Sequence, residues 1–394
     1  MSQPLIFISA GEISGDLHGG RMLASLRRRF PSLTAFGIGG RELESAGLEK
    51  FADISQLSLV GITEVLPRLF SIYRLLSRTR EELTRRRPRA VVLIDAPDFN
   101  LPLARHAHSL GIKVIYYISP TIWAWRRKRL EGIRKNVDLM LTILPFEEDL
   151  YRRNGVRSAY VGNPLVDQAG TAAPRASFLK SLGINEKADI VALLPGSRRS
   201  EVRRILPLLL EAASILGKRS SPPLFIFPAA SGEIYDLLLP LVGKGLPGAI
   251  VVRGRAIDVL ASSRAAVVTS GTATLEAALQ STPFLAVYRL SSISYLIGRM
   301  MVKTPWISLP NILLREGVVV ELIQNQCRPE RIAAETARLI DDDRAALRMK
   351  RYFAIMRETL GAGDAADRAA GAVAAEADLD DSFSPVDHQE NSRQ

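Results

Sequence analysis

Short apolar runs rich in β-branched residues alternate with longer amphipathic segments along most of the chain. Apolar runs of about five residues are typical of strands buried on both faces, and amphipathic segments of about ten residues or more are typical of helices. The expected strands begin at Leu5, Ala90, Lys113, Asp138, Ile190, Leu224, Ala265 and Pro283. Such regular alternation predicts an α/β protein whose sheets are parallel and are covered by helices.

The two halves of the chain open in the same way, with a strand, a loop of small residues and then a helix. The first loop reads FISAGEISGD and the second reads ALLPGSRRSE. We therefore predict two Rossmann-like lobes, residues 1–165 and 166–355, with a linker in the Gly-, Pro- and Ala-rich segment 162–174. Helices in residues 356–377 are expected to pack back on the first lobe or on a partner, and the polar acidic tail, residues 378–394, is expected to be disordered.

The composition limits the location and the partners of the protein. Its single cysteine, Cys327, cannot form an internal disulfide, and the N-terminus has neither the basic region nor the cleavage site of a secretory signal. No apolar run reaches the length of about 18 residues that a membrane-spanning helix needs, so we expect a cytoplasmic protein. The net charge of +11 favours an anionic partner, but charge alone does not distinguish nucleic acid, anionic lipid and a phosphorylated substrate.

Polar residues follow two of the strands expected in the first half. Glu12 and Ser14 lie in the glycine-containing loop after the first strand, where open α/β sheets place ligands. Asp95 directly follows an apolar strand, and burial there would raise the pKa of its carboxyl toward the range of a general base. Each feature has a structural alternative: a tight turn for the loop, and for Asp95 a cap of the next helix, a role that suits Asp98 better.

Two loops of the second half have the composition of a phosphate site, each between a strand and a helix whose free N–H groups favour an anion. The first loop contains Gly196, Ser197 and Arg198, and the second contains Ser270, Gly271 and Thr272. Arg198 can stabilise negative charge on a leaving diphosphate, and Glu276, one turn into the next helix, can accept hydrogen bonds from two ribose hydroxyls. Either loop alone could be structural, but the two loops together favour a site for a nucleoside diphosphate.

Other segments favour contact with a sugar, a phosphate or a membrane. Trp123 lies near Arg126, Arg127 and Arg129, and this combination of residues suits sugar rings and phosphate as well as nucleic acid. Residues 66–80 and 294–306 mix apolar side chains with cations, as in helices that lie on a membrane surface, although core-facing helices are more common. The four histidines lack ligands at metal-binding spacing and no P-loop or G-x-G-x-x-G is present, so we expect neither a metal nor a cofactor.

A series of segments resembles the signature segments of lipid-A-disaccharide synthases, in that family's order. They read GEISGD, LVGITEVLP, IDAPDFN, SPTIWAWR, LPFE, LLPGSR, SGTATLE and SLPN, and they span residues 9–311. Ile13 stands where the family pattern leads us to expect a hydroxyl residue. The resemblance implies a GT-B architecture, in which two Rossmann-like lobes face each other across a cleft and the C-terminal lobe holds most of the nucleotide.

The resemblance also implies a reaction, the metal-independent condensation of UDP-2,3-diacylglucosamine with 2,3-diacylglucosamine 1-phosphate into a β-1,6 disaccharide and UDP. In this hypothesis Asp95 deprotonates the acceptor's 6-hydroxyl, which inverts the donor's anomeric carbon, while the two loops hold the departing UDP. Glu276 and Asn311 hold the ribose and nearby polar groups, and Glu12 and Ser14 face the cleft. Contacts with the acyl-sugar, or with acidic headgroups at the periphery of the inner membrane, are assigned to Trp123, Arg126, Arg127 and Arg129. A homodimer is possible.

Three other readings remain open at this point. The first is another GT-B enzyme, such as a UDP-N-acetylglucosamine 2-epimerase or a lipid-linked glycosyltransferase of cell-wall assembly. The second is a nucleic-acid-binding protein, which would bind RNA or DNA with a steep dependence on salt, although we expect no nucleic-acid partner. The third is a membrane-binding scaffold without catalytic activity.

Overall fold

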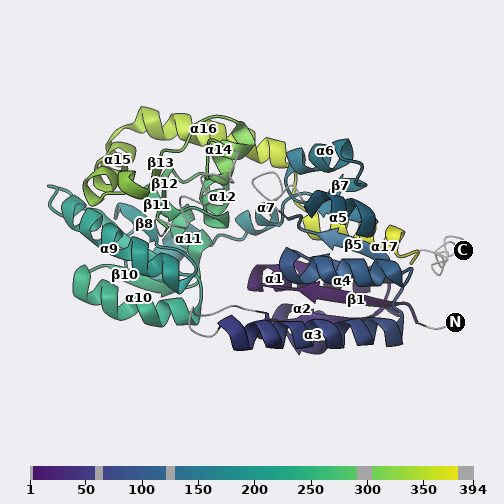
Figure 1. Ribbon diagram of the computed structural model, residues 1–394. Coiled ribbons are helices and arrows are strands. Elements are labelled where there is room, and N and C mark those ends of the chain that lie inside the picture. The colour runs from purple at the N-terminus through teal and green to yellow at the C-terminus, as the bar shows by residue number, and fades with distance from the viewer. Residues whose placement is uncertain (1–2, 58–64, 121–128, 291–303, 380–394) are drawn as a thin grey trace, which may run out of the picture. The chain divides into compact units, whose positions relative to one another are not determined.

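The computed structural model describes residues 3–57, 65–120, 129–290 and 304–379. The chain forms two compact units, one made of Met1–Pro164 and Asp364–Gln394 and the other of Leu165–Gly363. Both units are α/β with parallel sheets (Figure 1). No helix in the described segments has both the length and the apolar character needed to cross a bilayer.

The first unit is built on a seven-stranded parallel sheet with the order β3-β2-β1-β4-β5-β6-β7. Its strands are β1 (Leu5–Ala10), β2 (Thr34–Gly39), β3 (Leu48–Asp53), β4 (Ala90–Ile94), β5 (Lys113–Tyr117), β6 (Leu139–Thr142) and β7 (Ser158–Tyr160). Its helices are α1 (Ile13–Arg29), α2 (Arg41–Ser45), the 3-10 turn η1 (Ile54–Gln56), α3 (Val65–Arg86), α4 (Pro97–Ser109), α5 (Arg129–Asn136), α6 (Pro145–Arg153) and α17 (Ala365–Glu376).

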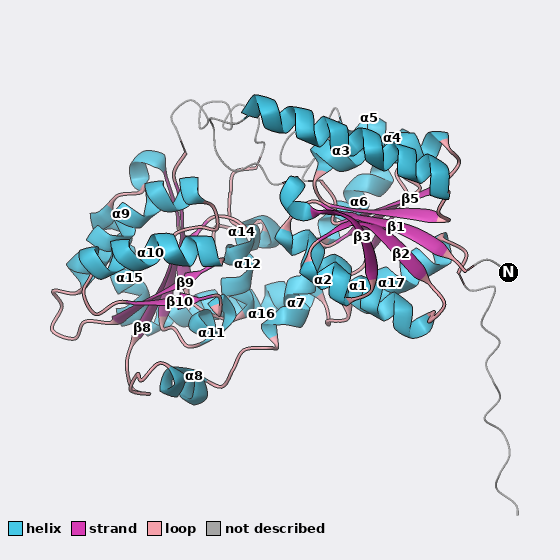
Figure 2. Cartoon of the chain, turned by 90° about the horizontal axis from the view of Figure 1, so that it is seen from below, coloured by secondary structure: helices cyan, strands magenta, loops and turns pink. Residues whose placement is uncertain are grey.

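Alternate residues of the central strands enter two separate cores, one on each face of this sheet. In β4, Val92 and Ile94 pack in one core, whereas Val91 and Leu93 pack in the other. The first core is closed by α1 and α17, and the second by α3, α4, α5 and α6. Figure 2 shows α3, α4 and α5 on one side of the sheet and α1, α2 and α17 on the other. Burial on both faces explains why β4 is apolar at every position.

The second unit is built on a six-stranded parallel sheet with the order β10-β9-β8-β11-β12-β13. Its strands are β8 (Ile190–Leu194), β9 (Leu224–Ala229), β10 (Ile250–Arg253), β11 (Ala265–Thr269), β12 (Phe284–Tyr288) and β13 (Glu321–Ile323). Its helices are α7 (Pro164–Ala169), α8 (Arg175–Ser181), α9 (Arg199–Leu216), α10 (Gly232–Gly245), α11 (Ala256–Ala261), α12 (Thr272–Leu279), α14 (Leu309–Leu314), η3 (Gln324–Gln326), α15 (Pro329–Asp341) and α16 (Asp343–Leu360).

The observed boundaries differ from the predicted ones in two places. The predicted linker contains the short helix α7, which begins with a proline and is too short to show a hydrophobic period. The predicted boundary after residue 355 falls inside α16, and the chain returns to the first unit only at Asp364. There α17 packs against α1, where Asp367 accepts a hydrogen bond from Ser25 and forms an ion pair with Arg28. From residue 380 onward the predicted tail lies outside the described residues.

Candidate functional site

Each sheet has one point at which the strand order reverses, between β1 and β4 in the first unit and between β8 and β11 in the second. Ligands of open α/β sheets bind beyond the carboxyl ends of the strands at such a switch point. Glu12, Ser14 and Asp95 follow β1 and β4, and the two predicted phosphate loops follow β8 and β11. The topology therefore brings the candidate residues of each unit to one place.

In the first unit the loops after β1 and β4 touch. A Cβ atom added to Gly11 would lie 2.0 Å from the Cβ of Ala96, so only glycine allows this approach. Glu12 precedes α1 and Ser14 lies in its first turn, and both residues are exposed. Ile13, where the sequence departs from the family pattern, is 74% exposed between them. The residues after β1 thus lie beside the loop that contains Asp95.

The half-buried Asp95 lies in a strained stretch of backbone. Asp95 and Ala96 have φ angles of 49° and 43°, in the left-handed region that non-glycine residues seldom adopt. Such residues cost about 1–3 kcal/mol each and persist only where surrounding contacts enforce them. Here the contacts are hydrogen bonds to the Asp95 carbonyl oxygen from Asn100 Nδ2, at 2.8 Å, and from the Tyr116 hydroxyl, at 2.6 Å.

Asn100 and Tyr116 support Asp95, and the sequence analysis missed both. The fully buried Asn100 also donates to the carbonyl of Ile94 at 3.1 Å, and its Oδ1 accepts a hydrogen bond from Ser9 at 2.8 Å. Burial and the nearby charge of Asp95 raise the pKa of Tyr116 well above its ordinary value, so its hydroxyl stays protonated and donates. The sequence signal that could have identified Asn100 was an asparagine five residues after Asp95, on the buried side of a helix.

Asp98 and Arg129 form an ion pair. The N-cap residue of α4, Ala96, makes no side-chain cap hydrogen bond, and Asp98 lies in the first turn, where a negative charge is favourable. The side chain of Arg129, predicted to contact the acceptor or a membrane, is 18% exposed, whereas that of its partner Asp98 is 80% exposed. Trp123, Arg126 and Arg127 lie outside the described residues.

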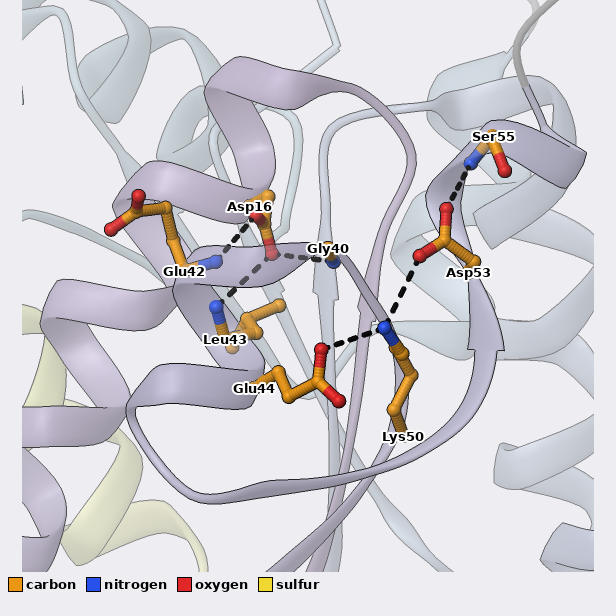
Figure 3. A network of polar contacts seen from close by, with 8 residues as sticks. All are labelled: Asp16, Gly40, Glu42, Leu43, Glu44, Lys50, Asp53 and Ser55. Atoms are coloured by element: carbon orange, nitrogen blue, oxygen red, sulfur yellow. Dashed lines mark hydrogen bonds and ion pairs between the residues drawn. The ribbon is translucent and has the colours of Figure 1, made fainter.

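A buried carboxylate joins α1 to α2 behind this loop (Figure 3). Asp16 accepts hydrogen bonds from the backbone N–H groups of Gly40, Glu42 and Leu43 at 2.7, 3.0 and 3.2 Å. It therefore satisfies the free donors at the start of α2, which is too short to be stable alone. The aspartate of the GEISGD segment is a structural residue of the first unit.

Replacing Asp16 by alanine is expected to lower the free energy of unfolding by about 3 kcal/mol, because it leaves buried N–H donors without an acceptor. The measurement is urea unfolding followed by circular dichroism. Glu44→Ala is the matched control, since the largely exposed Glu44 contacts only Lys50 in this network and an exposed ion pair contributes about 1 kcal/mol or less. Equal stabilities of the two variants would contradict this role of Asp16.

His18 is a buried histidine of α1 whose Nδ1 has no hydrogen-bond partner among the described residues. Burial, and secondarily the charge of Arg21, lower its pKa to about 4. The unfolded chain therefore binds a proton more readily between about pH 6.5 and pH 4, and stability falls as pH falls through this window. We expect the loss to reach about 3 kcal/mol.

The His18→Gln variant removes this titration. Its free energy of unfolding, measured by urea titration at several pH values, should fall less between pH 6.5 and pH 5 than that of the unsubstituted protein. His108→Gln, at an exposed position of α4, is the control and should leave the pH profile unchanged. Identical profiles for His18→Gln and the unsubstituted protein would contradict the assignment.

The loop after β8 in the second unit differs from the prediction. Gly196 has a φ of 120°, which favours glycine, but the space beside it is filled: an added Cβ would lie 2.6 Å from the Cβ and from Oε2 of Glu201. The same Oε2 accepts hydrogen bonds from the N–H groups of Ser197 and Arg198 at 3.0 and 3.3 Å. These two N–H groups, predicted to bind an anion, are occupied by a carboxylate. The Arg198 side chain remains 70% exposed.

The loop after β11 is tied to its neighbours. Thr269 Oγ1 donates to the carbonyl of Leu194 at 2.8 Å, which joins the ends of β11 and β8. Ser270 Oγ, predicted to donate to a phosphate, donates in this structure to the carbonyl of Ile307 at 2.8 Å. Gly271 and Thr272 are exposed at the start of α12. These two residues, rather than Ser270, face the solvent.

Glu276 and Asn311 differ in what their side chains can bind. No hydrogen bond or ion pair joins the half-buried Glu276 carboxylate to another described residue, and burial raises its pKa. Asn311 is fully buried, and its amide bonds to both backbone groups of Val319 at 2.8–2.9 Å and to Glu321 Oε1 at 2.9 Å. The Asn311 amide is thus bonded within the second unit, and the prediction that it binds the ribose stays a prediction.

Glu321 organises the segment that contains Asn311. Its carboxylate accepts hydrogen bonds from the N–H groups of Ile307 and Ser308 and from the Ser308 hydroxyl, at 2.6–3.0 Å. Because Ile307 in turn binds Ser270, this network fixes the segment beside the loop after β11. Glu321 thus links Asn311 and this segment to the loop after β11. Among the described residues, no three His, Cys, Asp or Glu side chains are grouped closely enough to hold a metal ion.

Comparison with known proteins gives concordant results. A family model described as lipid-A-disaccharide synthetase matches residues 6–372. The lipid-A-disaccharide synthase of Syntrophus aciditrophicus is 43% identical over 371 residues, which cover 94% of this chain and 97% of the relative. That of Myxococcus xanthus is 44% identical over 371 residues, with the same coverage.

Solved structures with low sequence identity share the fold. The S. aureus MnaA–UDP co-structure has a TM-score of 0.66 at 10% identity, with 96% of this chain and 97% of that chain covered. The calicheamicin glycosyltransferase CalG4 has a TM-score of 0.59 at 17% identity, with 96% and 99% covered. A putative UDP-N-acetylglucosamine 2-epimerase from Listeria monocytogenes has a TM-score of 0.65 at 12% identity, with 98% and 99% covered. The fold is therefore that of GT-B glycosyltransferases and related epimerases.

Proposed function

Since this chain belongs to the lipid-A-disaccharide synthase family, a family of glycosyltransferases in lipid A biosynthesis, we propose that it condenses UDP-2,3-diacylglucosamine with 2,3-diacylglucosamine 1-phosphate. The products are the β-1,6-linked disaccharide 1-phosphate and UDP. The reaction inverts the anomeric carbon, because the acceptor hydroxyl attacks it from the side opposite to UDP. Thus the bond from the anomeric carbon to the diphosphate oxygen breaks as the new glycosidic bond forms.

The strained and supported backbone at Asp95 is the observation that carries this proposal. Strain enforced by two hydrogen bonds to the Asp95 carbonyl oxygen is typical of residues held for function. In the proposed mechanism the Asp95 carboxylate accepts the proton of the acceptor's 6-hydroxyl as that oxygen attacks. Glu12 and Ser14, exposed beside the same loop, contact the sugars.

The second unit binds UDP in this proposal. The guanidinium of Arg198 pairs with the diphosphate and stabilises the charge that grows on it as UDP leaves. Gly271 and Thr272 contribute donors at the start of α12. The Glu276 carboxylate accepts hydrogen bonds from the two ribose hydroxyls, which would supply the partners that it lacks among the described residues.

Peripheral contact with the inner membrane is a further part of the proposal. In α3, Phe70 and Tyr73 are 71% and 67% exposed, next to the exposed Arg74 and Arg78. Exposed aromatic rings beside cations suit the headgroup region of an anionic bilayer, from which an acylated substrate would be drawn. The predictions for Trp123 and for residues 294–303 concern positions outside the described residues and are unchanged, as is the possible homodimer.

The test is to incubate the purified protein with both acylated sugars and to detect the disaccharide by mass spectrometry. UDP release is measured in parallel with and without the acceptor. The proposal requires disaccharide formation and acceptor-dependent UDP release. Conversion of the donor without any acceptor would favour an epimerase and overturn the proposal.

A further inference from the structure

Glu201 is a residue of the second unit to which the proposed mechanism assigns no role. It lies in the first turn of α9, and three features of the preceding loop meet at its side chain. Its Oε2 binds the N–H groups of Ser197 and Arg198. Its Cβ and Oε2 fill the space that a side chain at residue 196 would need. Its Oε1 lies 4.0 Å from Nη1 of Arg198.

These contacts fix the course of the loop. Two hydrogen bonds to a carboxylate are stronger than the same bonds to a neutral acceptor, and they hold the backbone of Ser197 and Arg198 toward the start of α9. The positive φ of Gly196 turns the chain so that the carboxylate can fold over it. The missing side chain at Gly196 therefore accommodates Glu201, whereas the sequence suggested that it accommodates a ligand.

The consequence concerns the side chain of Arg198. Its backbone is anchored, while its side chain is 70% exposed and its guanidinium lies 4.0 Å from the Glu201 carboxylate, an ion pair that contributes little in solvent. A cation on an anchored backbone is preorganised for an anion that arrives from solution. Burial, and secondarily the charge of Glu201, raise the pKa of the half-buried Tyr288 at the end of β12, whereas the charge of Arg198 lowers it.

We propose that Glu201 is a positioning residue that anchors the Gly196–Ser197–Arg198 backbone so that the Arg198 guanidinium meets the diphosphate of the UDP-linked donor. This inference rests on the proposed function. Glu201 does not touch the substrate, and it acts through the hydrogen bonds that it accepts. Its negative charge is secondary to those bonds, because the pairing with the Arg198 guanidinium is long and exposed.

Three variants test the proposal: Glu201→Ala, Glu201→Gln and the double variant Glu201→Ala/Arg198→Ala. We expect Glu201→Ala to weaken UDP binding and to lower kcat/KM for the donor by about 10-fold, because a cation displaced by about 1 Å loses much of its effect. Glutamine keeps an acceptor oxygen for the two N–H groups, although a weaker one than the carboxylate, so Glu201→Gln should be clearly less impaired than Glu201→Ala. The double variant should be no worse than Arg198→Ala alone, because Glu201 acts through Arg198.

UDP binding is measured by calorimetry, and kcat and KM by disaccharide formation. Glu211→Ala, at an exposed position about 15 Å further along α9, is the control and should change neither. The proposal is overturned if Glu201→Ala binds UDP normally, if Glu201→Gln is as impaired as Glu201→Ala, or if the losses in the double variant multiply. If the unsubstituted protein neither binds UDP nor forms disaccharide, the proposed function itself fails.

Discussion

Replacing Asp95 by asparagine is expected to lower the turnover of disaccharide formation by about 100-fold or more, because positioned general bases contribute about 10²–10⁴-fold to such reactions. Asparagine is the informative substitution at this position. It adopts the left-handed backbone of Asp95 readily, so the variant loses the proton acceptor while its fold is retained. The measurement is kcat at saturating concentrations of both sugars.

Measuring UDP binding distinguishes the loss of general-base catalysis in Asp95→Asn from a general loss of folding or binding. The diphosphate is assigned to the second unit, so Asp95→Asn should bind UDP as tightly as the unsubstituted protein. Asp149→Asn makes the same chemical change at an exposed position of α6 and should leave turnover unchanged. A normal kcat for Asp95→Asn would remove Asp95 from the mechanism.

The strands that the sequence predicted and those that it missed differ in their place in the sheets. All eight predicted strands are present, and they include the central strands β1, β4, β8 and β11. Strands buried on both faces read as continuous apolar runs. The missed strands are the four edges, β3, β7, β10 and β13, together with β2. An edge strand is short or half-exposed, as Glu49 and Lys50 show in β3, and therefore lacks this pattern.

The sequence located the candidate loops because topology decides where a parallel sheet presents ligand-binding residues. It could not show which groups of a loop are already bonded. Ser270 and Asn311 are residue types that often bind ligands. In the structure, however, the Ser270 hydroxyl donates to the carbonyl of Ile307 and the Asn311 amide donates to the carboxylate of Glu321, both later in the chain. Residue type gives the bonding capacity of a side chain, whereas its partner depends on packing. For the same reason the support of Asp95 by Tyr116 was not visible in the sequence.

Replacing Arg198 by alanine is expected to lower kcat for disaccharide formation by about 100-fold. Removal of one preorganised group that stabilises transition-state charge costs about 10²–10³ in rate, and in this proposal Arg198 faces the charge that grows on departing UDP. Lysine restores the charge without the forked pair of donors, so Arg198→Lys should fall between the two. The measurements are kcat and KM with the UDP-linked donor varied.

The neighbouring Arg199 provides the matched control, because it lies one residue further along the same helix start but pairs with Glu233 of α10 at 3.2 Å. Arg199→Ala removes the same charge and should alter kcat by no more than about twofold, since an exposed ion pair contributes little. If both alanine variants lose activity equally, the effect of Arg198 is one of net charge rather than of a positioned guanidinium. If Arg198→Ala retains full turnover, the loop after β8 has only a structural role, and other groups stabilise the charge on UDP.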